Sequence, residues 1–164
     1  MSKTTEDIKD KFVEAMGEGA KRRSLEFTRV TLLGSVRTDR RGQFARLKGP
    51  DRLCLFYYKA KGDADRLQRY DWALTAKILS QCEQAAKSRS APWYVVLLRG
   101  SPTQGYCLPG SMIEGQRRKW NYHETSDAYG VSEDAIPSSS FFASIDSLFT
   151  MLGCGPSATE VAQK

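Results

Sequence analysis

The chain has 164 residues, of which 40% are hydrophobic and 27% are charged, and its net charge is +6 at pH 7. These values are ordinary for a globular protein, and the length favours one domain with a buried core. No apolar run approaches the roughly 18 residues that a membrane helix needs, and the N-terminus lacks the apolar core of a signal peptide. We therefore expect a cytoplasmic protein.

The charges are unevenly distributed along the sequence. Between Lys21 and Lys61 there are twelve Lys and Arg residues and three acidic residues, whereas residues 120–163 contain six acidic residues and no Lys or Arg. Such an asymmetry indicates a surface that faces a polyanion. Nucleic acid is the partner that this pattern favours, because Lys and Arg neutralise phosphates and release counterions.

Cysteine and histidine residues do not form a metal-binding pattern. The four cysteines (Cys54, Cys82, Cys107 and Cys154) are irregularly spaced without a C-x-x-C pair, and His123 is the single histidine. A structural zinc site is therefore disfavoured. Three of the cysteines lie within apolar patterns, so we expect buried free thiols.

The first sixty residues predict a helix, a strand and a β-hairpin. The helix spans 4–20 and the strand spans 25–36, which is rich in β-branched and aromatic residues. Gly49-Pro50-Asp51 is a turn signal between two strand-like runs, 43–48 and 52–60. Because residues 53–58 are all apolar, the second run is expected to be a central strand covered on both faces.

The rest of the chain predicts a parallel crossover followed by shorter elements. A single helix is expected over 64–88, capped by Asp63 or Asp65, before a buried strand at 93–100. A strand at 105–115, a short hairpin made by "RRKWNYHE" and "AYGVS", and a helix at 144–152 follow. The predicted fold is a mixed-sheet α/β domain over residues 1–153 in the order α-β-β-β-α-β-β-α, with a flexible tail at 154–164.

This order resembles the restriction-endonuclease-like, or PD-(D/E)xK, nuclease superfamily. The resemblance rests on Pro50-Asp51, on "YYKAKGD" at 57–63, on Gln68 and Tyr70, and on "APWYVVLLRG" at 91–100. It covers about residues 5–100 and implies a DNA partner and, by analogy with restriction enzymes, a homodimer. Nucleases of this kind hold one or two Mg²⁺ ions with Asp and Glu, and an adjacent lysine orients the attacking water.

The expected carboxylates are missing around Lys59. The position two residues earlier carries Tyr57, and a phenol is a poor Mg²⁺ ligand. Asp51 and Lys59 lie at opposite ends of the expected strand, roughly 26 Å apart at 3.3 Å per residue. In the expected hairpin, Tyr57 would face Gln43 and Lys59 would face Arg41, so neither partner is acidic.

Other acidic residues could replace the missing ligands. The alternative catalytic set is Lys59, Lys61 and Asp63, with a metal site formed by Asp39, Asp63 and Glu18. This set would require Mg²⁺, whereas a protein that only binds nucleic acid needs no cofactor. In the opposite interpretation, Asp63 caps the following helix and Glu18 is solvated.

Three functions remain open at this point. The preferred one is a nucleic-acid-binding protein of nuclease-like fold with weak or no hydrolytic activity, and the second is a Mg²⁺-dependent DNA endonuclease with a rearranged carboxylate site. The third is a protein-interaction module, in which cations are scattered and an apolar patch is exposed. The candidate nucleic-acid-binding residues are Arg37, Arg40, Arg41, Lys59, Lys61, Arg117, Arg118, Lys119 and Trp120, because cations bind phosphates and aromatic rings stack on bases.

Overall fold

The computed structural model describes residues 3–30, 44–61 and 70–154. Its α-helices are α1 (Lys3–Lys21), α2 (Ala76–Ser88), α3 (Gly110–Arg117) and α4 (Ile145–Met151). Its strands are β1 (Glu26–Arg29), β2 (Phe44–Gly49), β3 (Arg52–Ala60), β4 (Trp72–Thr75), β5 (Trp93–Leu98), β6 (Gly105–Pro109), β7 (Asn121–His123), β8 (Ala128–Val131) and β9 (Phe141–Phe142). Two 3₁₀ turns, η1 (Glu133–Ala135) and η2 (Ser138–Ser140), connect β8 to β9.

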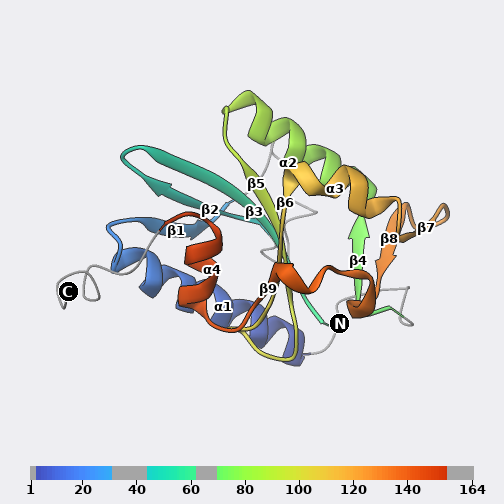
Figure 1. The fold of residues 1–164 in the computed structure, drawn as a ribbon, viewed down its shortest axis with the longest axis horizontal. Helices are drawn as coiled ribbons and strands as arrows, with labels where there is room; N and C mark the ends of the chain where they lie inside the picture. The colour runs from blue at the N-terminus through green and yellow to red at the C-terminus, as the bar shows by residue number, and fades with distance from the viewer. Residues whose placement is uncertain (1–2, 31–43, 62–69, 155–164) are drawn as a thin grey trace.

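A mixed sheet of six strands forms the centre of the molecule, in the order β1-β2-β3-β5-β6-β9 (Figure 1). β3 and β5 are parallel, and the other neighbours are antiparallel. The expected hairpin around Gly49-Pro50-Asp51 and the expected parallel crossover from β3 to β5 are both confirmed. As the run of apolar residues predicted, every side chain from Cys54 to Tyr58 is buried.

Helices α1 and α4 pack on one face of this sheet. Ile8, Phe12 and Met16 of α1 lie in the same apolar cluster as Phe56 and Tyr58 of β3. Their i, i+4, i+8 spacing places them on one side of the helix, as the sequence predicted. Helix α4 follows Ser144, whose side chain accepts a hydrogen bond from the Ser147 amide (3.1 Å), and it ends before Gly153, which has a positive φ of 75°.

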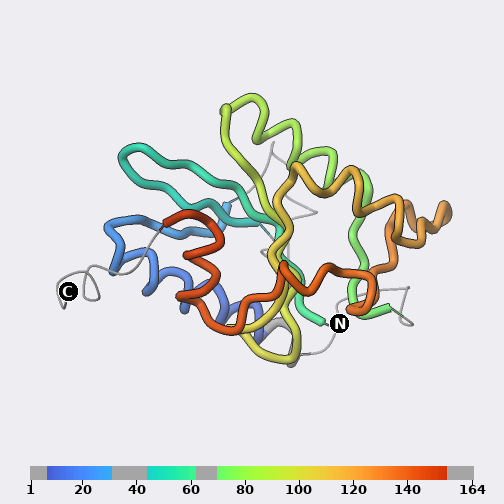
Figure 2. The backbone as a smooth tube through the Cα atoms, in the orientation of Figure 1, coloured from blue at the N-terminus to red at the C-terminus, as the bar shows by residue number. Residues whose placement is uncertain are grey.

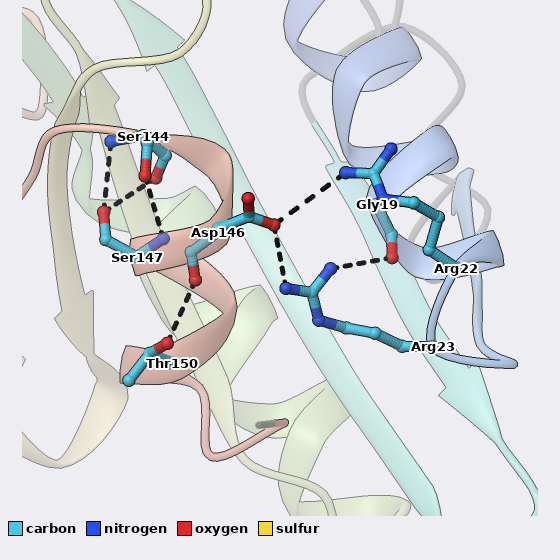
Figure 3. Close-up of polar contacts among 7 residues, drawn as sticks. All are labelled: Gly19, Arg22, Arg23, Ser144, Asp146, Ser147 and Thr150. Atoms are coloured by element: carbon cyan, nitrogen blue, oxygen red, sulfur yellow. Dashed lines mark hydrogen bonds and ion pairs between the residues drawn. The ribbon is translucent and has the colours of Figure 1, made fainter. Parts of the chain in front are cut away.

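An ion pair joins the ends of α1 and α4 across the surface (Figure 3). The Asp146 carboxylate lies 2.9 Å from Nη2 of Arg23 and 3.8 Å from Nη2 of Arg22. The Arg23 guanidinium also lies 4.3 Å from the centre of the Phe149 ring and donates to the Gly19 carbonyl at 3.0 Å. Two of the basic residues in the 21–61 stretch therefore contribute to helix packing.

The other face of the main sheet is covered by α2, α3 and a second sheet. This small antiparallel sheet has the order β4-β8-β7, and it lies on the opposite side of the fold from α4 (Figures 1 and 2). Leu55 and Tyr57 of β3 belong to the apolar cluster on this face, together with Trp72 of β4 and Ile78 of α2. The expected hairpin near residues 120–131 is confirmed as β7 paired with β8.

Two predicted elements were wrong in their extent. The expected helix over 64–88 is a strand and a shorter helix in its described part, because residues 72–75 pair with β8 and α2 begins only at Ala76. Thr75 is the N-cap of α2, and the predicted capping residues Asp63 and Asp65 lie outside the described residues. The expected strand over 105–115 is β6 followed by α3, which begins at Gly110 after Pro109.

The broad class of the fold is as expected, a single α/β domain with a mixed sheet and flanking helices, although it contains more elements than the predicted order. Cys54, Cys82 and Cys107 are buried free thiols, and Cys154 is half-buried and also free. No helix within the described ranges is long and apolar enough to cross a membrane.

Candidate functional site

The residue that replaces the expected metal carboxylate is part of the core. Tyr57 is 0% exposed, and its ring centre lies 5.5 Å from that of Phe44 on the neighbouring strand. The expected register was wrong by one residue, since Tyr57 faces Phe44 instead of Gln43. Gln43 and Arg41 lie outside the described residues. An aromatic pair therefore occupies this part of the hairpin.

Lys59 lies on the same face of β3 as Tyr57, because side chains alternate along a strand. It is 3% exposed. Glu18, which was expected near it, is exposed on α1, and α1 packs on the opposite face of β3, where Phe56 and Tyr58 point. The fold therefore does not bring Glu18 and Lys59 together.

Lys61 lies at the end of β3 in a charged cluster that we call the Glu133 cluster, formed by Lys61, Asp71, Arg99, Tyr106 and Glu133. The Lys61 ammonium lies 3.3 Å from Oε1 of Glu133 and 3.7 Å from Oδ1 of Asp71. Arg99 Nε lies 2.6 Å from Oε2 of Glu133, and the Tyr106 hydroxyl donates to the same oxygen at 2.7 Å. The Glu133 amide donates to Oδ2 of Asp71 at 2.8 Å.

These contacts favour the ionised form of Glu133. The hydrogen bond from Tyr106 and the charges of Lys61 and Arg99 hold the pKa of Glu133 below its ordinary value, although burial acts in the opposite direction. Burial and the same hydrogen bond raise the pKa of Tyr106. The cluster thus places two carboxylates and two cations at the carboxyl ends of the parallel strands β3 and β5.

Sequence reasoning missed Asp71, Arg99, Tyr106 and Glu133. Asp71 was placed inside a helix, and Glu133 belonged to a weakly patterned region sixty-two positions further along the chain. The one sequence feature that pointed to this region was the excess of acidic residues after Trp120. That excess does not show which other residues lie near these acids in the folded protein. Pairing between β4 and β8 brings these residues together.

Several predicted site residues lie outside the described part of the chain: Arg37, Asp39, Arg40, Arg41 and Asp63. Within the described ranges, no group of three or more His, Cys, Asp and Glu side chains is placed to hold a metal ion. The expected metal site of Asp39, Asp63 and Glu18 therefore stays a prediction.

The basic run after α3 has two exposed members. Arg118 and Lys119 are exposed, whereas Arg117 is half-buried and pairs with Glu114 of the same helix. Trp120, which was expected to stack on bases, is 6% exposed and packs against Tyr129 with ring centres 6.1 Å apart. The neighbouring Tyr122 is 49% exposed. The accessible aromatic ring of this segment is therefore Tyr122.

Comparison with known proteins provides support for the fold. No protein-family model and no curated protein matches the chain. Among solved structures, the chain is similar to Hjc, a Holliday junction resolvase from the archaeal hyperthermophile Archaeoglobus fulgidus, with a TM-score of 0.51. The two are 13% identical, and the similarity covers 95% of this chain and 96% of that one. The chain and Hjc therefore share a similar fold over nearly their whole lengths.

Proposed function

We propose that this chain is a nucleic-acid-binding protein of nuclease-like fold with weak or no hydrolytic activity. The observation that carries the proposal is the burial of Tyr57 against Phe44. In a nuclease of this fold, the position two residues before the lysine would hold a metal ligand. A buried aromatic pair supplies no carboxylate, and a phenol binds Mg²⁺ poorly.

Burial of Lys59 supports the same conclusion. A lysine that orients an attacking water has to reach the reacting phosphate, and Lys59 is 3% exposed. Lys61, which is 40% exposed, already contacts two carboxylates. Metal-assisted hydrolysis needs a metal ion next to the nucleophilic water, and Tyr57, two residues before Lys59, supplies no carboxylate to hold one.

Charge supports binding to nucleic acid. The net charge of +6 and the sequence pI of about 9.2 favour polyanionic partners. Exposed cations are available at Arg118 and Lys119 after α3 and at Lys21 and Lys48 near the α1–β1 connection. The similar fold of Hjc, a protein named for its action on Holliday junctions, supports DNA as the first partner to test.

The test compares binding with cutting on the same DNA. Fluorescent single-stranded, duplex and four-way-junction DNA is titrated with protein in chelator, and each DNA is then incubated with Mg²⁺ or Mn²⁺. We expect binding that weakens by orders of magnitude between about 50 and 200 mM salt, with no more cutting in metal than in chelator. Sedimentation of the protein, with and without DNA, tests whether it forms the homodimer suggested by analogy.

A surface variant tests whether the binding is specific to the basic run. Arg118→Ala combined with Lys119→Ala is expected to weaken binding and to reduce its salt dependence, since two phosphate contacts are lost. The matched control, Lys11→Ala with Lys87→Ala, removes the same charge from exposed positions on α1 and α2. Absence of binding by the wild type at low salt would refute the proposal and favour the protein-interaction module.

A metal-dependent DNA endonuclease is the second candidate, and one observation favours it. Lys61 contacts the carboxylates of both Asp71 and Glu133. A lysine with two acidic partners is therefore present two residues after Lys59, the lysine of the expected motif. If the protein cuts DNA with Mg²⁺, Asp71→Asn and Glu133→Gln should abolish cutting, whereas Glu124→Gln at an exposed position should not. If cutting survives both substitutions, Asp71 and Glu133 are excluded as the metal-binding residues of a nuclease site.

A further inference from the structure

Tyr122 is the most exposed large hydrophobic side chain in the part of the chain that the structure describes. It is 49% exposed, and Met151 on α4, at 38%, is the other such side chain. Tyr122 lies in β7, the outer strand of the small sheet. Figures 1 and 2 show the β7–β8 hairpin at an outer end of the molecule, away from α1 and α4. Tyr122 therefore lies in a strand at the outer edge of the small sheet.

The ring is held in place by its neighbours. Its centre lies 5.1 Å from that of Tyr129, the residue opposite it on β8, and Tyr129 in turn packs on the buried Trp120. The Tyr122 hydroxyl donates to the Asp127 carboxylate at 2.7 Å. Because the ring contacts Tyr129 and its hydroxyl is hydrogen-bonded, little conformational entropy is lost when a planar ligand stacks on the exposed part.

The charges around Tyr122 indicate where a polyanion would lie. Arg118 and Lys119 are exposed immediately before β7, whereas Glu124 and Asp127 are exposed at the turn after it. Phosphates are attracted to Arg118 and Lys119 and are repelled by Glu124 and Asp127. Stacking on Tyr122 requires a base whose face is accessible, as in a single strand, whereas the bases of a duplex are stacked on each other.

We propose that Tyr122 is a stacking platform for an unpaired base of single-stranded or locally opened nucleic acid, with Arg118 and Lys119 contacting the flanking phosphates. The inference rests on the proposed function, because it assigns a site and a strand preference to that same binding activity. Aromatic stacking and basic contacts are the general means by which proteins bind unpaired strands without sequence preference. The site differs from the one expected from the sequence, since Trp120 is buried.

The experiment measures affinity for three fluorescent DNAs of equal strand length: an oligodeoxythymidine strand, an abasic strand with the same phosphates, and a blunt duplex. Tyr122→Ala is expected to weaken binding to the oligodeoxythymidine by roughly 5- to 150-fold, the range that corresponds to losing one stacked base. Its affinity for the abasic strand should stay close to that of the wild type, because that strand has no base to stack. Tyr122→Phe retains the ring and should retain most of the affinity.

Met151→Ala is the matched control, because it removes the other exposed large hydrophobic side chain. It should leave all three affinities unchanged. Circular dichroism and thermal unfolding of each variant establish that the fold is retained. As a second measurement, ultraviolet crosslinking of the wild-type protein to a bromodeoxyuridine strand should label the peptide that contains Tyr122.

Two results would overturn the inference while leaving the proposed function intact. One is wild-type affinity of folded Tyr122→Ala for the oligodeoxythymidine, and the other is crosslinking confined to peptides without Tyr122. An equal loss on the base-containing and abasic strands would also overturn it, since the ring would then contact the backbone. If the wild type binds none of the three DNAs, the proposed function and the inference both fail.

Discussion

At the scale of single residues, Tyr57 distinguishes a metal site from a hydrophobic core. A carboxylate at this position would indicate a metal site, whereas a buried aromatic ring belongs to the core. Its side chain is fully buried in an apolar cluster with Phe44, Leu55 and Trp72. A carboxylate at this position would lose its hydration without gaining a cation from these neighbours, and that is unfavourable. The substitution that would restore the nuclease pattern is therefore one that these apolar neighbours disfavour.

We predict that Tyr57→Ala lowers the free energy of unfolding by about 3–5 kcal/mol, the usual cost of truncating a buried aromatic side chain. Tyr57→Glu should also destabilise the protein, because it buries a charge among apolar groups. Urea unfolding at pH 7 measures both, with Met151→Ala as an exposed control. If Tyr57→Glu proves as stable as the wild type and cuts DNA with Mg²⁺, position 57 belongs to a metal site that has lost one ligand.

Glu133 makes stability depend on pH. The pKa of this carboxyl is lowered in the folded protein by the Tyr106 hydrogen bond and by Lys61 and Arg99. A group whose folded pKa lies below its unfolded pKa stabilises the protein above the unfolded value, near 4.3 for a glutamate. That stabilisation is lost as the pH falls through the folded pKa.

We therefore expect Glu133→Gln to be less stable than the wild type at pH 7 and to lose less stability on acidification. Urea unfolding between pH 7 and about pH 3, a range that extends below the unfolded glutamate pKa near 4.3, measures both effects. Glu124→Gln, at an exposed position on the β7–β8 turn, is the control. Parallel pH profiles for the wild type and Glu133→Gln would show that the cluster contributes nothing to acid stability.

At the scale of elements, two glycines of α1 have different surroundings. A Cβ added at Gly17 would meet no atom within 4 Å, whereas one added at Gly19 would lie 2.6 Å from Cε2 of Phe149 on α4. The Phe149 ring also carries the Arg23 guanidinium on its face. Movement of that ring would therefore disturb the ion pair with Asp146 that joins the two helices (Figure 3).

We predict that Gly17→Ala raises the free energy of unfolding by about 0.5–1 kcal/mol, the gain from replacing glycine by alanine within a helix. Gly19→Ala should lower it, by about 1–3 kcal/mol for overpacking. Thermal and urea unfolding of the pair test the α1–α4 contact, since both changes add the same methyl group to the same helix. Equal stabilisation by both would mean that α4 moves away from α1 at no cost.

The stretch from Tyr70 to Ser88 shows how far pattern alone specifies an element. Its apolar spacing predicts one helix, and the second half of that helix is present with Ile78, Cys82 and Ala85 buried. Residues 72–75 form a strand because their amides and carbonyls pair with β8, and Trp72 is buried with its indole nitrogen donating to the Leu98 carbonyl at 3.1 Å. The helical spacing of apolar residues does not indicate that residues 72–75 pair with β8, which lies far away in the sequence.

At the scale of the whole molecule, the Glu133 cluster connects the two sheets. Lys61 follows β3 and Arg99 follows β5 of the main sheet, Asp71 precedes β4 of the small sheet, and Glu133 follows β8. Its ion pairs and the Tyr106 hydrogen bond thus fix the small sheet at the carboxyl ends of β3 and β5. This arrangement also determines where the β7–β8 hairpin, and with it Tyr122, is presented.

The sequence alone determined the features that depend on local chemistry: the apolar central strand, the Gly49-Pro50-Asp51 hairpin, α1, the free thiols and the absence of a carboxylate two residues before Lys59. Tertiary structure alone decided which distant groups meet, since pairing of β4 with β8 places Asp71 beside Glu133. It also decided that Trp120 is buried and Tyr122 exposed. The physical reason is that short-range pattern sets which face of an element is apolar, whereas long-range pairing sets which element covers that face.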